Sequence, residues 1–311
     1  MMVNYSYIAP ILLAALLVAG CSSEDTLPEL GGDTGEDPVL EERYGALLAE
    51  FVYPRGWGGS GVEVQAQFLD ARGVAVESAL EALEVWMPRR GLEMGDCQLG
   101  ASERADYNGY EPVSLHLLDV GHIEVESPGG ETALPPRRLP DLLSAFYGVV
   151  YGSEWSWESE LNLVEYYPGA PYRFSAPGSA KAGGFDVVLS APDPIILMAA
   201  NGAELRDESS LEVAADEDLE LVWDIDGPGA GSVEVFLDLS TGYGPDQNRI
   251  QCRVEDDGAY TIPGSLIREL GEDRSGLELE LRRVRRSNAT VDGLDEAHFY
   301  FVTTDRLEIL F

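Results

Sequence analysis

The chain has 311 residues and a formal net charge of −36, because 56 acidic side chains outnumber 20 basic ones. A surface with this excess of negative charge repels phosphate backbones, so the composition argues against nucleic-acid binding. The length that follows a leader is enough for two domains of ordinary size.

The chain begins with an apolar leader. Residues 8–20 carry no charge and are too few to span a bilayer as a helix, but they match the core of an export signal. Val18-Ala19-Gly20-Cys21 then resembles the lipobox of bacterial lipoproteins, where a peptidase cuts before an acylated cysteine. The resemblance implies a signal peptide at 1–20 and a lipid anchor on Cys21. The alternative is an ordinary secretory signal with an unrelated cysteine.

Two features refine this location. The residue after the cysteine is Ser22 and not an aspartate, which resembles the signal that sends such lipoproteins to the outer membrane. Residues 22–42 contain eight acidic side chains, no basic ones and several Gly and Pro. Because such a segment has little to bury, residues 21–42 are predicted to form a disordered acidic tether.

Residues 43–190 are predicted to form an N-terminal β domain. Apolar and polar side chains alternate over 62–68, which indicates a half-buried strand. Shorter alternations follow at 83–87, 113–117 and 123–125, and 185–190 closes the region. Residues 138–146 favour one short helix.

Residues 191–311 are predicted to form a second β domain, after a proline-rich joint at 191–194. Seven candidate strands lie at 195–199, 219–223, 233–239, 250–254, 277–284, 298–302 and 307–311. This number of short strands is typical of an immunoglobulin-like sandwich. Residues 262–270, with Pro263 near the first turn, predict one short helix. The predicted fold class is therefore all-β, with two mostly antiparallel, sandwich-like domains.

Several phrases of the sequence suggest a family. The lipobox and acidic tether, Asp96-Cys97-Gln98, Leu118-Asp119-Val120-Gly121, and the segment from Ile250-Gln251-Cys252 to Tyr260-Thr261-Ile262-Pro263 are similar to uncharacterised lipoproteins of myxobacteria and related deltaproteobacteria. The resemblance implies an architecture and a location, and it assigns no activity.

Cys97 and Cys252 are the two cysteines that remain after Cys21. In an exported protein an even pair of this kind predicts a disulfide, which would join the two halves of the chain. The alternative is a pair of separately buried thiols that pack as small apolar side chains.

Aromatic side chains are concentrated in residues 146–174, where nine occur in 29 positions. Trp155 and Trp157 are two residues apart, so on a strand they would share a face. Together with Tyr166 and Tyr167 they are the candidate ligand-binding residues, since exposed rings stack on sugars and supply rigid contact area. The alternative is that these rings form the core of the first domain.

Other polar groups carry weaker signals. His116 and His122 are six residues apart and would share a face of one continuous strand, where two histidines with nearby carboxylates can bind zinc, but Gly121 indicates a bend, so a structural role is favoured for the histidines, His298 included. The acidic runs at 224–227 and 255–258 lack the spaced oxygen ligands of a calcium loop and are typical of turns. No metal is therefore predicted. The sequence has no HExxH, GxSxG or GxxxxGK[ST] motif, so no catalytic residue or cofactor is predicted. Four arginines at 282–286 could meet an anionic partner or could pair with carboxylates of neighbouring strands.

These observations predict a membrane-anchored bacterial lipoprotein with a non-catalytic binding or structural role at the cell envelope. It would be attached to the outer membrane and face the periplasm or the cell surface. Its expected partners are the membrane, through the lipid, and an envelope protein or polysaccharide. The alternative is a carbohydrate-binding module or carbohydrate-active enzyme centred on 146–174. The sequence does not indicate an oligomeric state.

Overall fold

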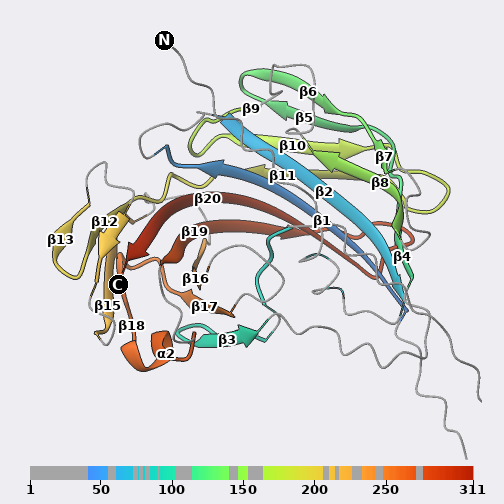
Figure 1. Cartoon of the computed structure of the whole chain (residues 1–311). Coiled ribbons are helices and arrows are strands. Elements are labelled where there is room, and N and C mark those ends of the chain that lie inside the picture. The colour runs from blue at the N-terminus through green and yellow to red at the C-terminus, as the bar shows by residue number, and fades with distance from the viewer. Residues whose placement is uncertain are drawn as a thin grey trace, which may run out of the picture. The chain divides into compact units, whose positions relative to one another are not determined.

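The computed structural model describes residues 41–54, 61–72, 76, 80, 85–89, 91–101, 114–139, 146–152, 164–205, 210–213, 217–225, 233–241, 248–270 and 276–310. These residues form β-strands and a short helix, α2 (Gly264–Arg268). The strands build one large and two smaller sheets, most of whose pairings are antiparallel (Figure 1). The predicted all-β class with sandwich-like layers is therefore confirmed, and α2 lies where a short helix was predicted.

The main sheet has twelve strands. Its path runs through β3 (Cys97–Ala101), β17 (Asn248–Val254), β16 (Glu234–Ser240), β19 (Leu277–Asn288), β20 (Glu296–Leu310), β1 (Glu41–Val52), β2 (Gly61–Arg72), β4 (Ser114–Leu117), β8 (Phe146–Gly152) and β7 (Arg137–Leu139). Two short strands pair beside this path, β14 (Ser210–Glu212) with β20 and β9 (Val164–Glu165) with β2.

At the centre of the main sheet β1 and β20 pair in parallel, with Tyr44 opposite Glu296. Most residues of both strands are buried on both faces. A strand covered on both sides carries a nearly continuous apolar run instead of a clean alternation. This explains why the alternating pattern of the sequence did not predict β1.

Two smaller sheets cover one face of the main sheet, which we call the inner face. The first covering sheet consists of β11 (Phe185–Ser190), β10 (Pro171–Ala176), β5 (Ile123–Ser127) and β6 (Gly130–Leu134). Its alternating residues, such as Tyr172 and Phe174, pack with Phe68, Phe299 and Phe301 of the main sheet in one hydrophobic core. Figure 1 shows this sheet over β1 and β2.

The second covering sheet consists of β13 (Ala203–Glu204), β12 (Leu197–Ala200), β15 (Leu219–Trp223) and β18 (Ala259–Ile262). Leu221 and Trp223 pack with Leu237, Leu279 and Ile309 of the main sheet in a second core. Asn201 and Gly202 both have positive φ values in the turn between β12 and β13, which is the backbone that a two-residue type I′ hairpin requires.

The opposite face of the main sheet, which we call the outer face, is covered by the described residues between 76 and 96. We call these residues the covering segment. Val76, Leu80 and Val85 pack on Tyr44 and Leu69. Trp86 and Leu92 of the same segment pack in a separate cluster with side chains of β1, β16, β19 and β20. The predicted strand at 83–87 is therefore wrong over 85–87, because these residues have no strand pairing and cover a sheet instead of extending one.

The two cores do not divide at the predicted domain boundary of 190/191. The first core contains residues from Leu47 to Ala191 together with Val291, Ala297, Phe299 and Phe301, and the second core contains residues from Ile195 to Ile309. The main sheet also continues across this boundary, because β20 pairs with both β19 and β1. Residues 39–311 form one compact unit.

Two further predictions are corrected by the strand pairing. The separate strands predicted at 298–302 and 307–311 are one strand, β20, because β19 pairs with it continuously from Leu277 to Asn288. The helix predicted at 138–146 is wrong at both ends, since β7 extends to Leu139 and β8 begins at Phe146. Residues 140–145 lie outside the described residues. Within the part of the chain that is described, no helix has the length and apolarity needed to cross a membrane.

Candidate functional site

Cys97 and Cys252 form a disulfide. The two residues lie directly opposite each other in the antiparallel pair of β3 and β17, with Cα atoms 4.0 Å apart. Cys252 is fully buried in the second core, and Tyr260 of β18 places its hydroxyl 3.3 Å from Cys97 Sγ. The bond therefore holds an edge strand, 155 residues away in sequence, on the main sheet.

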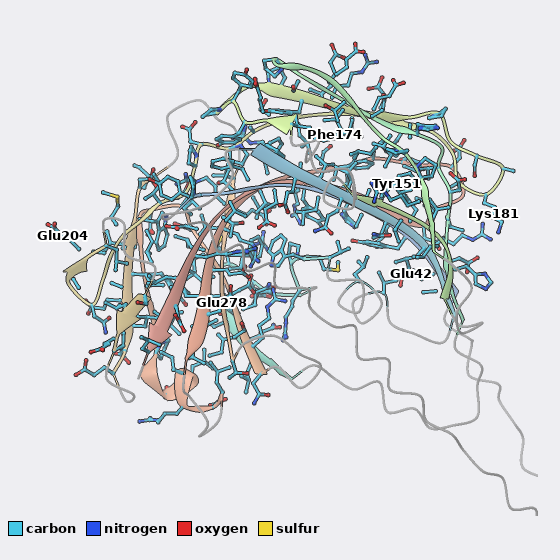
Figure 2. All side chains as sticks on the ribbon, turned by 45° about the horizontal axis from the view of Figure 1, so that its top comes forward. Glu42, Tyr151, Phe174, Lys181, Glu204 and Glu278 are labelled. Carbon is cyan, nitrogen blue, oxygen red and sulfur yellow. A yellow bond between two sulfur atoms is a disulfide. The ribbon has the colours of Figure 1, made fainter. Side chains whose placement is uncertain are left out.

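The side chains of the aromatic-rich stretch at 146–174 that the structure describes contribute mainly to the first core. Tyr151, Tyr172 and Phe174 are buried there, and Figure 2 labels Tyr151 and Phe174. Tyr166 stacks on Phe51 with ring centroids 3.9 Å apart, and its hydroxyl donates to Pro192 O at 2.6 Å.

The structure describes two of the four candidate ligand-binding residues, and of these Tyr167 is exposed and Tyr166 is partly buried. The Tyr167 side chain is 36% exposed, and its hydroxyl donates to the Glu165 carboxylate. That hydrogen bond is the main reason why the pKa of Tyr167 is raised. Trp155 and Trp157 lie outside the described residues, as does Cys21 with the leader and tether up to residue 40. Tyr166 and Tyr167 are neighbours in the sequence, but Tyr166 stacks on Phe51 and Tyr167 lies on the surface.

The three histidines do not meet. His116 lies on β4, His122 is exposed before β5, and His298 lies on β20. Among the described residues no group of three or more His, Cys, Asp or Glu side chains is arranged to hold a metal ion. Asp256, from the acidic run at 255–258, instead accepts hydrogen bonds from Trp223 and Arg283.

The arginines at 282–286 pair with acceptors of neighbouring elements. Arg283, fully buried on the inner face, uses all five N–H donors, on the Asp256 carboxylate and on the carbonyl oxygens of Asp193, Pro194 and Asp224. These hydrogen bonds hold residues 193 and 194, which connect the two cores, against β19. Arg282 points to the outer face, so the two side chains alternate as expected on a strand.

A buried polar network surrounds Asp238 on the outer face. Its carboxylate accepts hydrogen bonds from four groups: Arg249 Nε, Gln251 Nε2, Trp86 Nε1 and Arg282 Nη1, at 2.5–2.9 Å. Burial alone would raise the pKa of Asp238, but the two guanidinium groups and the two neutral donors together lower it. The hydrogen bond from Trp86 anchors the covering segment to the sheet.

Beside this network lies a pocket of about 440 Å³ between the main sheet and the covering segment. Five adjacent strands form its floor, and residues 87–93 of the covering segment, as far as they are described, form its other wall. The floor residues are Tyr44, Glu296, His298, Tyr300, Arg286, Glu234, Phe236 and Arg253. Sequence reasoning missed this site, because its residues come from positions 44 to 300 and share no local motif.

Several charged or titratable groups of the pocket are paired with neighbouring side chains. Arg253 Nη2 and Arg286 Nη2 lie 3.3 and 3.1 Å from Glu234 Oε1. His298 is held at both ring nitrogens, with Nδ1 2.8 Å from Asn288 Oδ1 and Nε2 3.0 Å from Glu296 Oε2.

Tyr300 lies on the pocket floor, opposite Arg286 on the neighbouring strand. Burial raises its pKa to about 12, although Tyr44 and Arg286 act in the opposite direction. The phenol is therefore neutral at physiological pH. The pocket thus combines guanidinium donors, carboxylates and aromatic rings within one cavity.

Neither a protein-family model nor a curated protein matches this chain.

Proposed function

We propose that the protein is a lipid-anchored, non-catalytic binding protein of the bacterial envelope. In this proposal the acylated Cys21 attaches it to the outer membrane, and the pocket on the outer face of the main sheet binds a ligand. The candidate partners are an envelope protein or a polysaccharide at the cell surface or in the periplasm.

The disulfide between Cys97 and Cys252 is the main structural support for the proposed location. Disulfides persist in exported proteins and are rare in the reducing cytosol. The bond therefore supports the independent signal of the leader, in which an apolar core is followed by small residues and Cys21. Two unrelated features of the chain, one at its beginning and one in its core, point to export.

The pairing inside the pocket favours binding over catalysis. A general acid or base needs a protonatable atom that can reach the substrate. His298 has both ring nitrogens occupied by Asn288 and Glu296, and Glu234 lies between two arginines. Side chains fixed in this way can recognise a ligand without transferring a proton to it.

The alternative, a carbohydrate-binding module or carbohydrate-active enzyme at 146–174, has less support. Tyr151, Tyr172 and Phe174 are buried, and Tyr166 is packed on Phe51, so these rings are engaged in the core. Tyr167 is the exposed member of the stretch that the structure describes. A binding face there would rest on Tyr167 and on Trp155 and Trp157.

Mass spectrometry of the protein purified from its native membrane tests the anchoring. We expect a new amino terminus at Cys21 that carries acyl chains, and Cys21→Ser is expected to leave the leader attached or the product unacylated. An unmodified thiol at the amino terminus, or a leader that is retained in the native protein, would contradict the anchoring. Cross-linking of the anchored protein in that membrane, followed by identification of the products, tests the binding role.

A further inference from the structure

Two arginines share one carboxylate at the charged end of the pocket. Arg253 and Arg286 both direct Nη2 to the same oxygen of Glu234. One carboxylate can neutralise only one of the two guanidinium groups, so this end has charged donors for a further acceptor. The lining as a whole is of mixed charge, because Arg89, Glu93 and Glu296 also belong to it.

Arg253 also has hydrogen-bonding capacity left over. Its Nη1 donates to Leu92 O at 3.1 Å and its Nη2 faces Glu234, but its buried Nε has no acceptor among the described residues. A buried donor without an acceptor costs about 1–3 kcal/mol, so such groups are uncommon unless something else satisfies them. The Arg253 guanidinium group therefore keeps one donor unused among the described residues.

The rest of the pocket is suited to an apolar or planar body. Tyr44, Phe236 and Tyr300 line the floor with aromatic rings that are almost fully buried, and Met87 and Leu92 line the side of the covering segment. A volume of about 440 Å³ is within the range of small-molecule sites, which combine apolar walls with a few polar groups that fix orientation.

We propose that this pocket binds a small carboxylic acid with a ring or other apolar body. The carboxylate accepts from Arg286 and Arg253, and the body lies against Tyr300 and Phe236. In the free protein Glu234 occupies the guanidinium groups, so the ligand competes with it for the same donors. This inference rests on the proposed binding function and names the class of ligand for that site.

A carboxylate fits better than a phosphate or sulfate for two reasons. The position of Glu234 shows that a carboxylate oxygen can lie between these two guanidinium groups. Glu93, Glu234 and Glu296 also line the pocket, so a second negative charge on the ligand would be repelled by the side chains around it.

Isothermal titration calorimetry of the full-length protein with phenylacetate tests the proposal, with phenylacetamide as its uncharged counterpart. Acetate tests the contribution of the ring, and inorganic phosphate and sulfate test the type of anion. We expect phenylacetate to bind at millimolar or lower concentration, and each of the other four probes to bind more weakly. No heat with phenylacetate, equal binding of phenylacetamide, or tighter binding of phosphate or sulfate would overturn the proposal.

Variants at the charged end give changes of opposite sign. The Arg286 side chain is 45% exposed. Arg286→Gln is expected to weaken phenylacetate binding about tenfold, since one charged donor is lost. Glu234→Gln is expected to strengthen binding about threefold or more, because the competing carboxylate is neutralised. A merely structural role for these residues would weaken binding in both variants, and this result would contradict the proposal.

Arg306→Gln is the matched control. Arg306 lies on the outer face of β20, is 42% exposed and is paired with Glu280 at 2.9 Å, but it does not line the pocket. Its replacement should leave the affinity for phenylacetate unchanged, and an equal loss with Arg286→Gln would assign the effect to overall charge. Circular dichroism checks that each variant is folded. Acylation of Cys21 is measured separately by mass, so failure of the ligand assay is distinguishable from failure of the anchoring.

Discussion

Arg282 and Asp238 form an ion pair inside the protein, with Nη1 of the arginine 2.5 Å from Oδ2 of the aspartate and neither side chain more than 5% exposed. Removing two charges from water is costly, and the cost is offset only when further hydrogen bonds satisfy both groups. Here Arg249, Gln251 and Trp86 complete the shell of Asp238. These hydrogen bonds therefore stabilise the buried pair. Loss of Asp238 or Arg282 would leave the other charge buried without its partner.

Asp238→Asn tests this network. The substitution keeps the shape but removes the charge that faces Arg249 and Arg282, so two guanidinium groups lose their common partner. We expect a loss of about 3–5 kcal/mol in the free energy of unfolding, measured by urea denaturation. Asp186→Asn, which breaks an exposed pair with Arg173, is the control and should change stability little. Equal effects of the two substitutions would show that burial of the pair does not matter.

The same carboxylate predicts a pH dependence. The pKa of Asp238 is lowered in the folded protein, so its contribution to stability is fully present above its unfolded pKa of about 3.9. This contribution is lost as the pH falls through the lower, folded value. The stability difference between the wild-type protein and Asp238→Asn should therefore be constant from about pH 7 to 5 and shrink below about pH 4. Urea denaturation across this range measures it, and a difference that does not change in acid would contradict the assignment.

The disulfide predicts a second loss of stability. Replacing both Cys97 and Cys252 by alanine should cost about 2–5 kcal/mol, because the bond closes a long loop and holds β3 at the edge of the sheet. Urea denaturation gives the magnitude, and hydrogen exchange should increase in residues 97–101. Reductant should destabilise the wild-type protein but not the double variant. If reductant affects both equally, its effect has another cause.

Arg283 predicts a third loss. Arg283→Lys keeps the positive charge, but three ammonium donors cannot replace five guanidinium donors in fixed geometry. Asp256 and the carbonyl oxygens of Asp193 and Pro194 would lose hydrogen bonds, so we expect a cost of about 3 kcal/mol in the free energy of unfolding. Arg306→Lys is the control at an exposed site, and an equal result there would contradict the special role of Arg283.

Much of the fold could be predicted from the sequence where side chains alternate. Residues 185–190 and 219–223 are strands with the predicted bounds, because each has one buried and one exposed face. The same reasoning failed for β1, whose two buried faces erase the alternation, and it divided β20 into two. The parallel pairing of β20 with β1 joins residues about 250 positions apart, so no local sequence pattern indicates it.

The candidate site could be predicted only in part. An even number of cysteines after the leader pointed to the pair Cys97 and Cys252, which the structure shows bonded. The aromatic count at 146–174 indicated apolar area but not whether that area is exposed. The pocket could not be predicted, because Tyr44, Glu234 and Arg253 meet only through the register of strands that are distant in sequence.

The central position of β1 in the main sheet constrains the order of assembly. Because β1 lies between β2 and β20, the sheet is incomplete until residues 296–310 have left the ribosome. Contacts between such distant segments form slowly, since a long loop must close first. A polypeptide whose main sheet stays open until β20 is available remains suitable for threading through a translocation channel, which is consistent with the export that we propose.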